Sequence, residues 1–143
     1  MFVDLEGKRA IVIGGGAVAL RRIRVLLEFR ADVTVISPEV HGDIGDAKSV
    51  MRKFEAGDLD GTFIAVAATD ERETNRAVGL EAKRLGIPVS VADCAAECTF
   101  FFPAVCKGAG LTAGIVSGGD EHGKTAAAAE KIRALLSEME EHR

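Results

Sequence analysis

Apolar and polar positions alternate in two ways along about the first ninety residues of the chain. Short apolar runs are typical of strands buried on both faces of a parallel sheet, whereas apolar positions three or four apart indicate helices packed on such a sheet. The runs predict buried strands at 9–13, 32–36, 63–68 and 87–91, and an edge strand at 50–54. Because helical stretches separate these strands, the pattern predicts repeated βα units and a Rossmann-like α/β fold.

Two amphipathic stretches supply the expected helices. The first starts at Ala17, where apolar residues begin to recur at helical spacing. The second extends to about Leu85, with Thr69 or Asp70 expected as its N-cap and Gly86 as its stop.

The alternation ends near residue 100. Two apolar runs, 100–105 and 111–116, flank a glycine-containing turn and predict a hairpin. The segment 124–140 is rich in Ala, Glu, Lys and Leu, which favours a helix. We therefore expect a dinucleotide-binding Rossmann domain at 1–99 and a hairpin followed by a C-terminal helix at 100–143.

Composition narrows the class of protein. With 143 residues, 48% apolar and 28% charged, the chain has the composition of an ordinary globular protein with one main domain. The net charge of −4 argues against a nucleic-acid partner, because such a partner requires a basic face. The longest apolar runs are too short to cross a bilayer, so we expect no membrane association.

The cysteines indicate a reducing compartment. Cys94, Cys98 and Cys106 form an odd set in a chain that shows no secretion signal, so we expect a cytoplasmic protein without a disulfide framework. With His122 they could suggest a metal site, but the spacing lacks a second close pair. We predict no metal site.

Three consecutive glycines, Gly14, Gly15 and Gly16, join the first strand to the first helix. With Ala19 they match the G-x-G-x-x-A dinucleotide fingerprint, in which residues without side chains let a pyrophosphate approach the backbone. The N-terminus of the following helix attracts its charge. The junction predicts a bound dinucleotide.

The end of the second strand leaves the choice of dinucleotide open. The acidic residue expected there is replaced by Ser37, with Glu39 close behind. Glu39 could accept the ribose hydroxyls of NAD, or serve only as an exposed loop residue. A serine with a nearby arginine would also tolerate the phosphate of NADP.

Five motifs then occur in order along the chain. They are Gly14-Gly15-Gly16-Ala17-Val18-Ala19 followed by Arg21-Arg22, Ala67-Ala68-Thr69-Asp70 with Asn75, Val91-Ala92-Asp93, Phe102-Pro103-Ala104, and Ser117-Gly118-Gly119. In this order they resemble the precorrin-2 dehydrogenase / sirohydrochlorin ferrochelatase family, the N-terminal module of siroheme synthase. The resemblance extends from Leu5 to about Ser137.

The resemblance implies a cytoplasmic homodimer that oxidises precorrin-2 to sirohydrochlorin with NAD as cofactor. In bifunctional members of the family, Fe²⁺ is then inserted, and Co²⁺ insertion is a related activity. Residues 100–143 would form the dimerisation region, and a tetrapyrrole would be the small-molecule substrate.

The resemblance also assigns residues. It places the catalytic carboxylate at Asp93, where a general base could take the proton while a hydride leaves the substrate. The cofactor contacts that it implies are Gly14, Gly15, Gly16, Ala17, Val18, Pro38, Glu39 and Thr69. We add Ser37 to these contacts because it stands at the end of the second strand. The backbone N–H groups of Ser117, Gly118 and Gly119 could hold a substrate carboxylate, although a plain turn would give the same sequence.

Three departures from the family pattern limit what the resemblance implies. Ser90 stands where the family usually has asparagine, and 120–123 replaces a Ser-Pro step. The sequence ends at Arg143, whereas family members carry a further helical segment that helps to cover the tetrapyrrole. This apparent truncation keeps an alternative open, a non-catalytic dinucleotide-binding subunit that senses redox state or regulates a partner.

Overall fold

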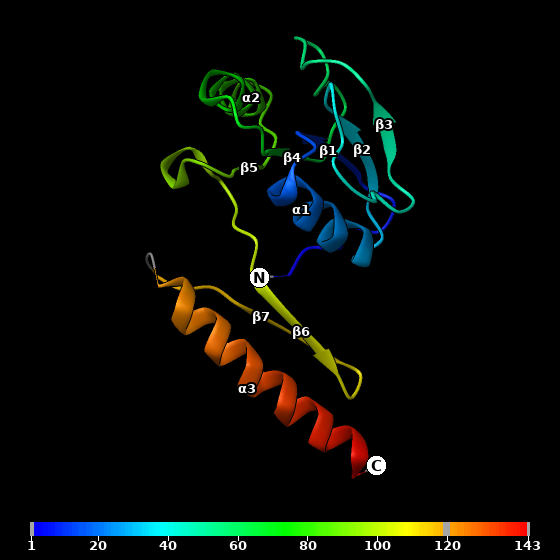
Figure 1. The fold of residues 1–143 in the computed structure, drawn as a ribbon, viewed down its shortest axis with the longest axis vertical. Helices are drawn as coiled ribbons and strands as arrows, with labels where there is room; N and C mark the ends of the chain where they lie inside the picture. The colour runs from blue at the N-terminus through cyan, green and yellow to red at the C-terminus, as the bar shows by residue number, and fades with distance from the viewer. Residues whose placement is uncertain (1, 119–120, 143) are drawn as a thin grey trace. The chain divides into compact units, whose positions relative to one another are not determined.

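Parallel strands build a sheet with the order β3-β2-β1-β4-β5, in the computed structural model shown in Figure 1. The strands are β1 (Arg9–Ile13), β2 (Asp32–Ile36), β3 (Lys48–Val50), β4 (Ile64–Ala67) and β5 (Val89–Val91). The structure describes residues 2–118 and 121–142, and within them the chain divides into two compact units, 1–100 and 101–143.

The carboxyl ends of the central strands meet at one edge of the sheet. Ile13 lies opposite both Ile36 and Ala67, and Ala67 lies opposite Val91. The strand order changes direction between β1 and β4, because β2 and β3 extend the sheet to one side of β1 and β5 extends it to the other. Open parallel sheets bind ligands at such a switch point, beyond the carboxyl ends of the strands.

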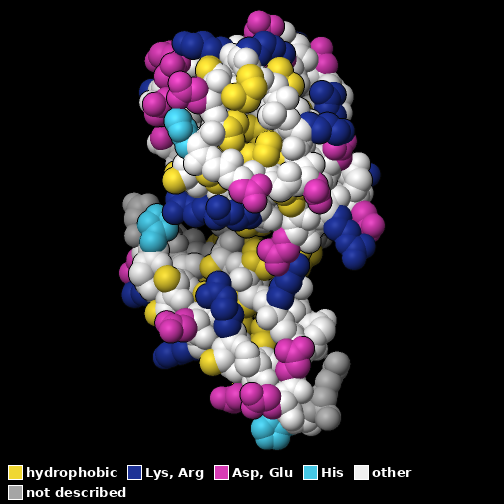
Figure 2. All heavy atoms as spheres, turned by 45° about the vertical axis from the view of Figure 1, so that its right-hand side comes forward, with side chains coloured by type: hydrophobic (Ala, Val, Ile, Leu, Met, Phe, Trp, Pro, Cys, Tyr) yellow, Lys and Arg dark blue, Asp and Glu magenta, His cyan; other side chains and the backbone are white. Residues whose placement is uncertain are grey.

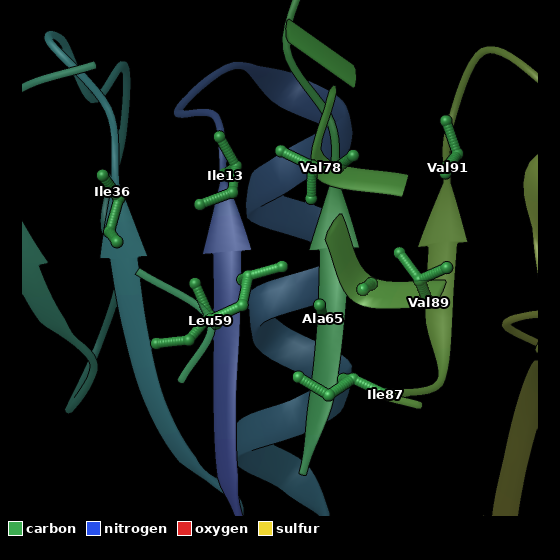
Figure 3. Packing of buried hydrophobic residues seen from close by; sticks show 11 residues of the cluster. Ile13, Ile36, Leu59, Ala65, Val78, Ile87, Val89 and Val91 are labelled. Carbon is green, nitrogen blue, oxygen red and sulfur yellow. The ribbon is translucent and has the colours of Figure 1, made fainter. Parts of the chain in front are cut away.

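Helices α1 (Ala17–Glu28) and α2 (Arg72–Arg84) follow β1 and β4. Figure 3 shows α1 behind the sheet, and a cluster of buried side chains on the opposite face that includes Val78 of α2 and Leu59 of the loop before β4. Leu59 and Val78 are fully buried there. The predicted Rossmann-like sheet, with helices on both of its faces, is therefore confirmed.

The edge strand and the start of the second helix lie elsewhere than expected. The edge strand predicted at 50–54 lies at Lys48–Val50, where every residue is exposed and no buried face marks it in the sequence. Helix α2 was expected to be capped by Thr69 or Asp70, but its N-cap is Glu71, and no side chain among the described residues caps it. The Thr69 hydroxyl instead accepts a 3.2 Å hydrogen bond from the amide of Glu71 and donates one to the Asn75 side chain.

The second unit contains β6 (Ala104–Gly108), β7 (Leu111–Ile115) and α3 (His122–Glu141). The strands pair antiparallel through a tight turn at Ala109 and Gly110, whose φ values are 50° and 74°. Cys106 of β6 packs with Ala129 and Leu136 of α3. The hairpin and helix predicted here are confirmed, with β6 beginning later than expected.

Charged side chains of both signs intermingle over the face of the protein drawn in Figure 2. None of the helices among residues 2–118 and 121–142 combines the length and the apolar character needed to span a membrane.

Candidate dinucleotide-binding site

The glycine loop passes close to the backbone that follows β2 and β4. A Cβ atom at Gly14 would lie 2.2 Å from the carbonyl oxygen of Ala68, and one at Gly15 would lie 2.1 Å from that of Glu39. Gly14 also adopts φ 123°, which L side chains rarely occupy. The close packing of this loop therefore requires glycine at its first two positions.

Gly16 differs from the other two. Its φ is −86°, and a Cβ atom there would meet no atom of the described residues within 4 Å. It is the N-cap of α1, and no side chain in the described part of the protein caps that helix. Because the first N–H groups of a helix lack intrahelical partners, an anion beside Gly16 would meet both free donors and the positive end of the helix dipole. The fold does not need glycine here, but a closely approaching pyrophosphate does.

The loop opens into a cleft of about 520 Å³ at the carboxyl edge of the sheet. This size lies within the range of small-molecule and cofactor sites. The cleft is lined by Ile13, Gly14, Gly15, Gly16, Ile36, Ser37, Pro38, Glu39, His41, Lys53, Phe54, Ala68, Thr69, Asp70, Glu71, Glu73, Thr74 and Ala77. Of the predicted cofactor contacts it brings together seven, all except Ala17 and Val18, which follow the loop in α1.

The segment after β2 forms one wall of the cleft. The buried Ser37 hydroxyl donates a hydrogen bond to the carbonyl oxygen of Glu39 at 2.7 Å, and the amide of His41 donates to the carbonyl oxygen of Gly15 at 2.9 Å. These bonds join the wall to the glycine loop. The carboxylate of Glu39 is 77% exposed and lies 3.3 Å from the His41 ring, so solvent and a ligand can both reach it.

Thr69 forms the opposite wall and is held by Asn75. The Asn75 side chain accepts hydrogen bonds from the Thr69 amide at 3.0 Å and from its hydroxyl at 2.7 Å, and donates to its carbonyl oxygen at 3.0 Å. Asn75 is fully buried. In the sequence Asn75 is only part of a motif. In the structure its side chain fixes the turn that follows β4.

Polar residues that sequence reasoning missed complete the rim. The Thr74 hydroxyl donates to the Glu71 carboxylate at 2.9 Å, and the Lys53 ammonium lies 3.5 Å from that carboxylate. The hydrogen bond from Thr74, followed by the charge of Lys53, lowers the pKa of Glu71. Lys53 falls within the stretch predicted as an edge strand at 50–54, and nothing in that pattern indicates a position beside the glycine loop.

Asp93 lies beside this cleft but is not among its lining residues. The amide of Ala92 donates to the carbonyl oxygen of Ala67 at 2.9 Å, which brings the end of β5 next to the end of β4, two residues before Thr69. The Asp93 carboxylate is 38% exposed and accepts a 2.6 Å hydrogen bond from Arg72. Its predicted catalytic role stays a prediction.

The predicted substrate contacts belong to the second unit. Ser117 and Gly118 follow β7 and are exposed, and Gly119 lies outside the described residues. Their role also stays a prediction. The described residues contain no group of three or more His, Cys, Asp or Glu side chains that could hold a metal ion.

Comparison with known proteins agrees with this geometry. The model of a family described as "Putative NAD(P)-binding" matches residues 1–104. A solved structure described as "SirC, precorrin-2 dehydrogenase" is 26% identical, with a TM-score of 0.77 over 94% of this chain and 69% of that one.

Curated relatives are more similar in sequence but much longer. The probable multifunctional siroheme biosynthesis protein HemA of Ruminiclostridium josui is 39% identical over 94% of this chain and 28% of its own length. The siroheme synthase of Pseudomonas entomophila is 38% identical over 84% of this chain and 27% of its own. The chain thus spans less than a third of these relatives, and the similarities confirm the resemblance carried by the five ordered motifs.

Proposed function

The chain belongs to the putative NAD(P)-binding family whose model it matches, and on this premise we propose that it is an NAD-dependent dehydrogenase that oxidises precorrin-2 to sirohydrochlorin. The observation that carries the proposal is the glycine loop at the switch point of the sheet, in a chain similar to precorrin-2 dehydrogenase over 94% of its length. The name of that structure suggests the reaction, and the cleft beside the glycine loop is the cofactor site that we propose.

The residues present fit a dinucleotide. The open space at Gly16 and the N–H groups at the start of α1 would hold the pyrophosphate. The exposed Glu39 would accept the ribose hydroxyls, which favours NAD over NADP because a 2′-phosphate there would face a carboxylate. A Glu39→Gln variant should therefore lower the ratio of NADP to NAD dissociation constants, measured by calorimetry.

The reaction removes a hydride and a proton from the substrate. NAD, when bound, supplies the chemistry of hydride acceptance. The Asp93 carboxylate accepts the proton, and its exposure at the carboxyl edge of the sheet leaves an oxygen atom accessible to a substrate. The backbone N–H groups of Ser117, Gly118 and Gly119 hold a substrate carboxylate.

Anaerobic turnover of precorrin-2 with NAD, followed by absorbance, tests the reaction directly. We expect sirohydrochlorin from the wild type, a fall in kcat of about 100-fold or more for Asp93→Asn, and no change for Asp46→Asn, an exposed loop aspartate. Well-folded wild-type protein that binds NAD but yields no product would refute the enzyme. Such a result would favour the alternative of a non-catalytic dinucleotide-binding subunit.

A homodimer is part of the proposal and is supported by exposed apolar side chains in the second unit. On α3, Leu135 and Met139 lie four residues apart and are 55% and 46% exposed. They share a helix face that α3 does not bury against the hairpin. We expect Leu135→Glu to yield monomers in light scattering, whereas Leu80 of α2, which is 60% exposed, should tolerate the same change. A cytoplasmic location is likewise proposed, from the reducing environment that free cysteines favour.

A further inference from the structure

Arg72 connects two carboxylates at the edge of the sheet. It is the first residue of α2, and its Nη1 atom donates to Asp93 Oδ1 at 2.6 Å while its Nη2 atom donates to Glu97 Oε2. The three side chains are 40%, 38% and 28% exposed, in the order Arg72, Asp93, Glu97. They therefore stand at the surface beside the cleft rather than in the core.

The backbone on both sides of Asp93 is held by hydrogen bonds, from the Ala92 amide to the Ala67 carbonyl oxygen at 2.9 Å and from the Cys94 amide to the Val91 carbonyl oxygen at 3.2 Å, whereas the Asp93 side chain is held by Arg72. The segment leaves the sheet after Val91 and is tied back by Cys98, whose Sγ atom accepts a 3.1 Å hydrogen bond from the Val91 amide. Between these points, Arg72 is the only partner within residues 2–118 and 121–142 that hydrogen-bonds the Asp93 side chain. The orientation of that carboxylate thus depends on one guanidinium.

The shape of the guanidinium suits this arrangement. Its planar fork presents separate N–H groups to two carboxylates at once, whereas a lysine ammonium is a point charge on a flexible chain. Glu97 holds one side of the fork, so the other side is aimed at Asp93 before any substrate arrives. When Asp93 takes a proton and becomes neutral, Glu97 still neutralises Arg72.

We propose that Arg72, anchored by Glu97, is a positioning residue that orients the Asp93 carboxylate for proton transfer. This inference rests on the proposed dehydrogenase function. A purely structural role is a poor explanation, because ion pairs this exposed contribute little to folding.

Steady-state kinetics of three variants tests the proposal. Arg72→Gln should lower kcat about 10-fold to 100-fold with the KM values for NAD and precorrin-2 nearly unchanged, because Arg72 acts on the orientation of Asp93 and not on the binding of either substrate. Arg72→Lys should restore part of the rate. Arg84→Gln is the matched control, since Arg84 also makes two hydrogen bonds to a carboxylate, that of Glu81, but at the other end of α2.

Rescue of an Arg72 variant by free guanidinium is a second test, because a purely structural role of Arg72 would not make kcat depend on added guanidinium. Millimolar guanidinium should raise the kcat of Arg72→Ala and leave that of Arg84→Ala unchanged. An unchanged kcat in Arg72→Gln would overturn the proposal. A raised KM for precorrin-2 at unchanged kcat would also overturn it, because Arg72 would then bind the substrate.

Amide hydrogen exchange tests the positioning role of Arg72 independently of whether the protein oxidises precorrin-2. In Arg72→Gln the amides of residues 92–98 should exchange several-fold faster than in the wild type or in Arg84→Gln. Inactive wild-type protein would refute the dehydrogenase, whereas unchanged exchange would refute the positioning role whether or not the protein is active.

Discussion

The three glycines of the loop should respond differently to the same small substitution. Gly14→Ala places a Cβ atom 2.2 Å from a backbone carbonyl oxygen that cannot move away easily, at φ 123°. Strain at such a φ costs about 1–3 kcal/mol, and overpacking costs about as much again. At roughly 4 °C per kcal/mol for a chain of this size, the melting temperature should fall by roughly 10–20 °C.

Gly16→Ala should leave the fold intact. Its Cβ atom meets nothing within 4 Å and its φ is ordinary, so the free energy of unfolding should change by less than about 1 kcal/mol. Dinucleotide binding should suffer, because the methyl group occupies the space through which a pyrophosphate reaches the helix N-terminus. Loss of one charge-assisted hydrogen bond costs about 1.5–3 kcal/mol, or about 10-fold to 100-fold in the dissociation constant.

Thermal melts and NADH titrations measure the two effects separately. The chain contains no Trp or Tyr, so NADH fluorescence can be followed without background from those residues. Gly123→Ala is the control, since a Cβ atom there also meets nothing and the residue lies in the second unit. If Gly16→Ala binds NADH as tightly as the wild type, the loop does not hold the pyrophosphate and the reasoning fails.

Three further changes test the framework around the cleft. Asn75→Ala removes the three hydrogen bonds to Thr69 from a fully buried position, so urea unfolding should show a loss of about 2–4 kcal/mol. A loss of less than about 1 kcal/mol would contradict the role of Asn75 in fixing the turn after β4. The hydrogen bonds from Arg52 lower the pKa of Asp58 in the folded protein. The pair therefore stabilises the protein fully at pH values above the ordinary aspartate pKa of about 3.9. This stabilisation is lost as the pH falls through the lower pKa of the folded state. The stability difference between wild type and Asp58→Asn should therefore shrink as the pH is lowered from about 5 to about 3, and a constant difference would rule the pair out as its source. Leu59→Ala should cost about 3 kcal/mol by calorimetry without weakening NADH binding to the folded protein, because Leu59 is fully buried but does not line the cleft.

Much of the fold could be predicted because buried strands appear in the sequence as continuous apolar runs. β1, β2 and β4 are nearly continuous apolar runs, and each was expected within a residue of its actual bounds. β3 was misplaced because its three residues are all exposed, so no apolar pattern distinguishes it from a loop. The start of α2 was misplaced because Thr69 bonds to Asn75, a partner across the turn that capping rules do not consider.

The candidate site was only partly predictable for a similar reason. The glycine loop, Ser37 and Thr69 follow strands directly, so their place at the sheet edge follows from the strand pattern. Arg72 reads as an ordinary surface charge at the start of a helix. Its pairing with Asp93 spans 21 residues and depends on the register of β4 and β5, which the sequence pattern does not specify.

The Arg52–Asp58 and Arg72–Asp93 ion pairs of the first unit differ in what they can contribute to folding. Asp58 is only 10% exposed and accepts two hydrogen bonds from Arg52, so that pair stabilises the loop that carries Leu59. Asp93 and Arg72 keep 38% and 40% of their side-chain surface, and pairs this exposed contribute little to folding. Variants of Arg72 should therefore change turnover at nearly constant melting temperature, whereas variants of Arg52 should do the reverse. That contrast separates a pair that orients a reacting group from one that holds the fold together.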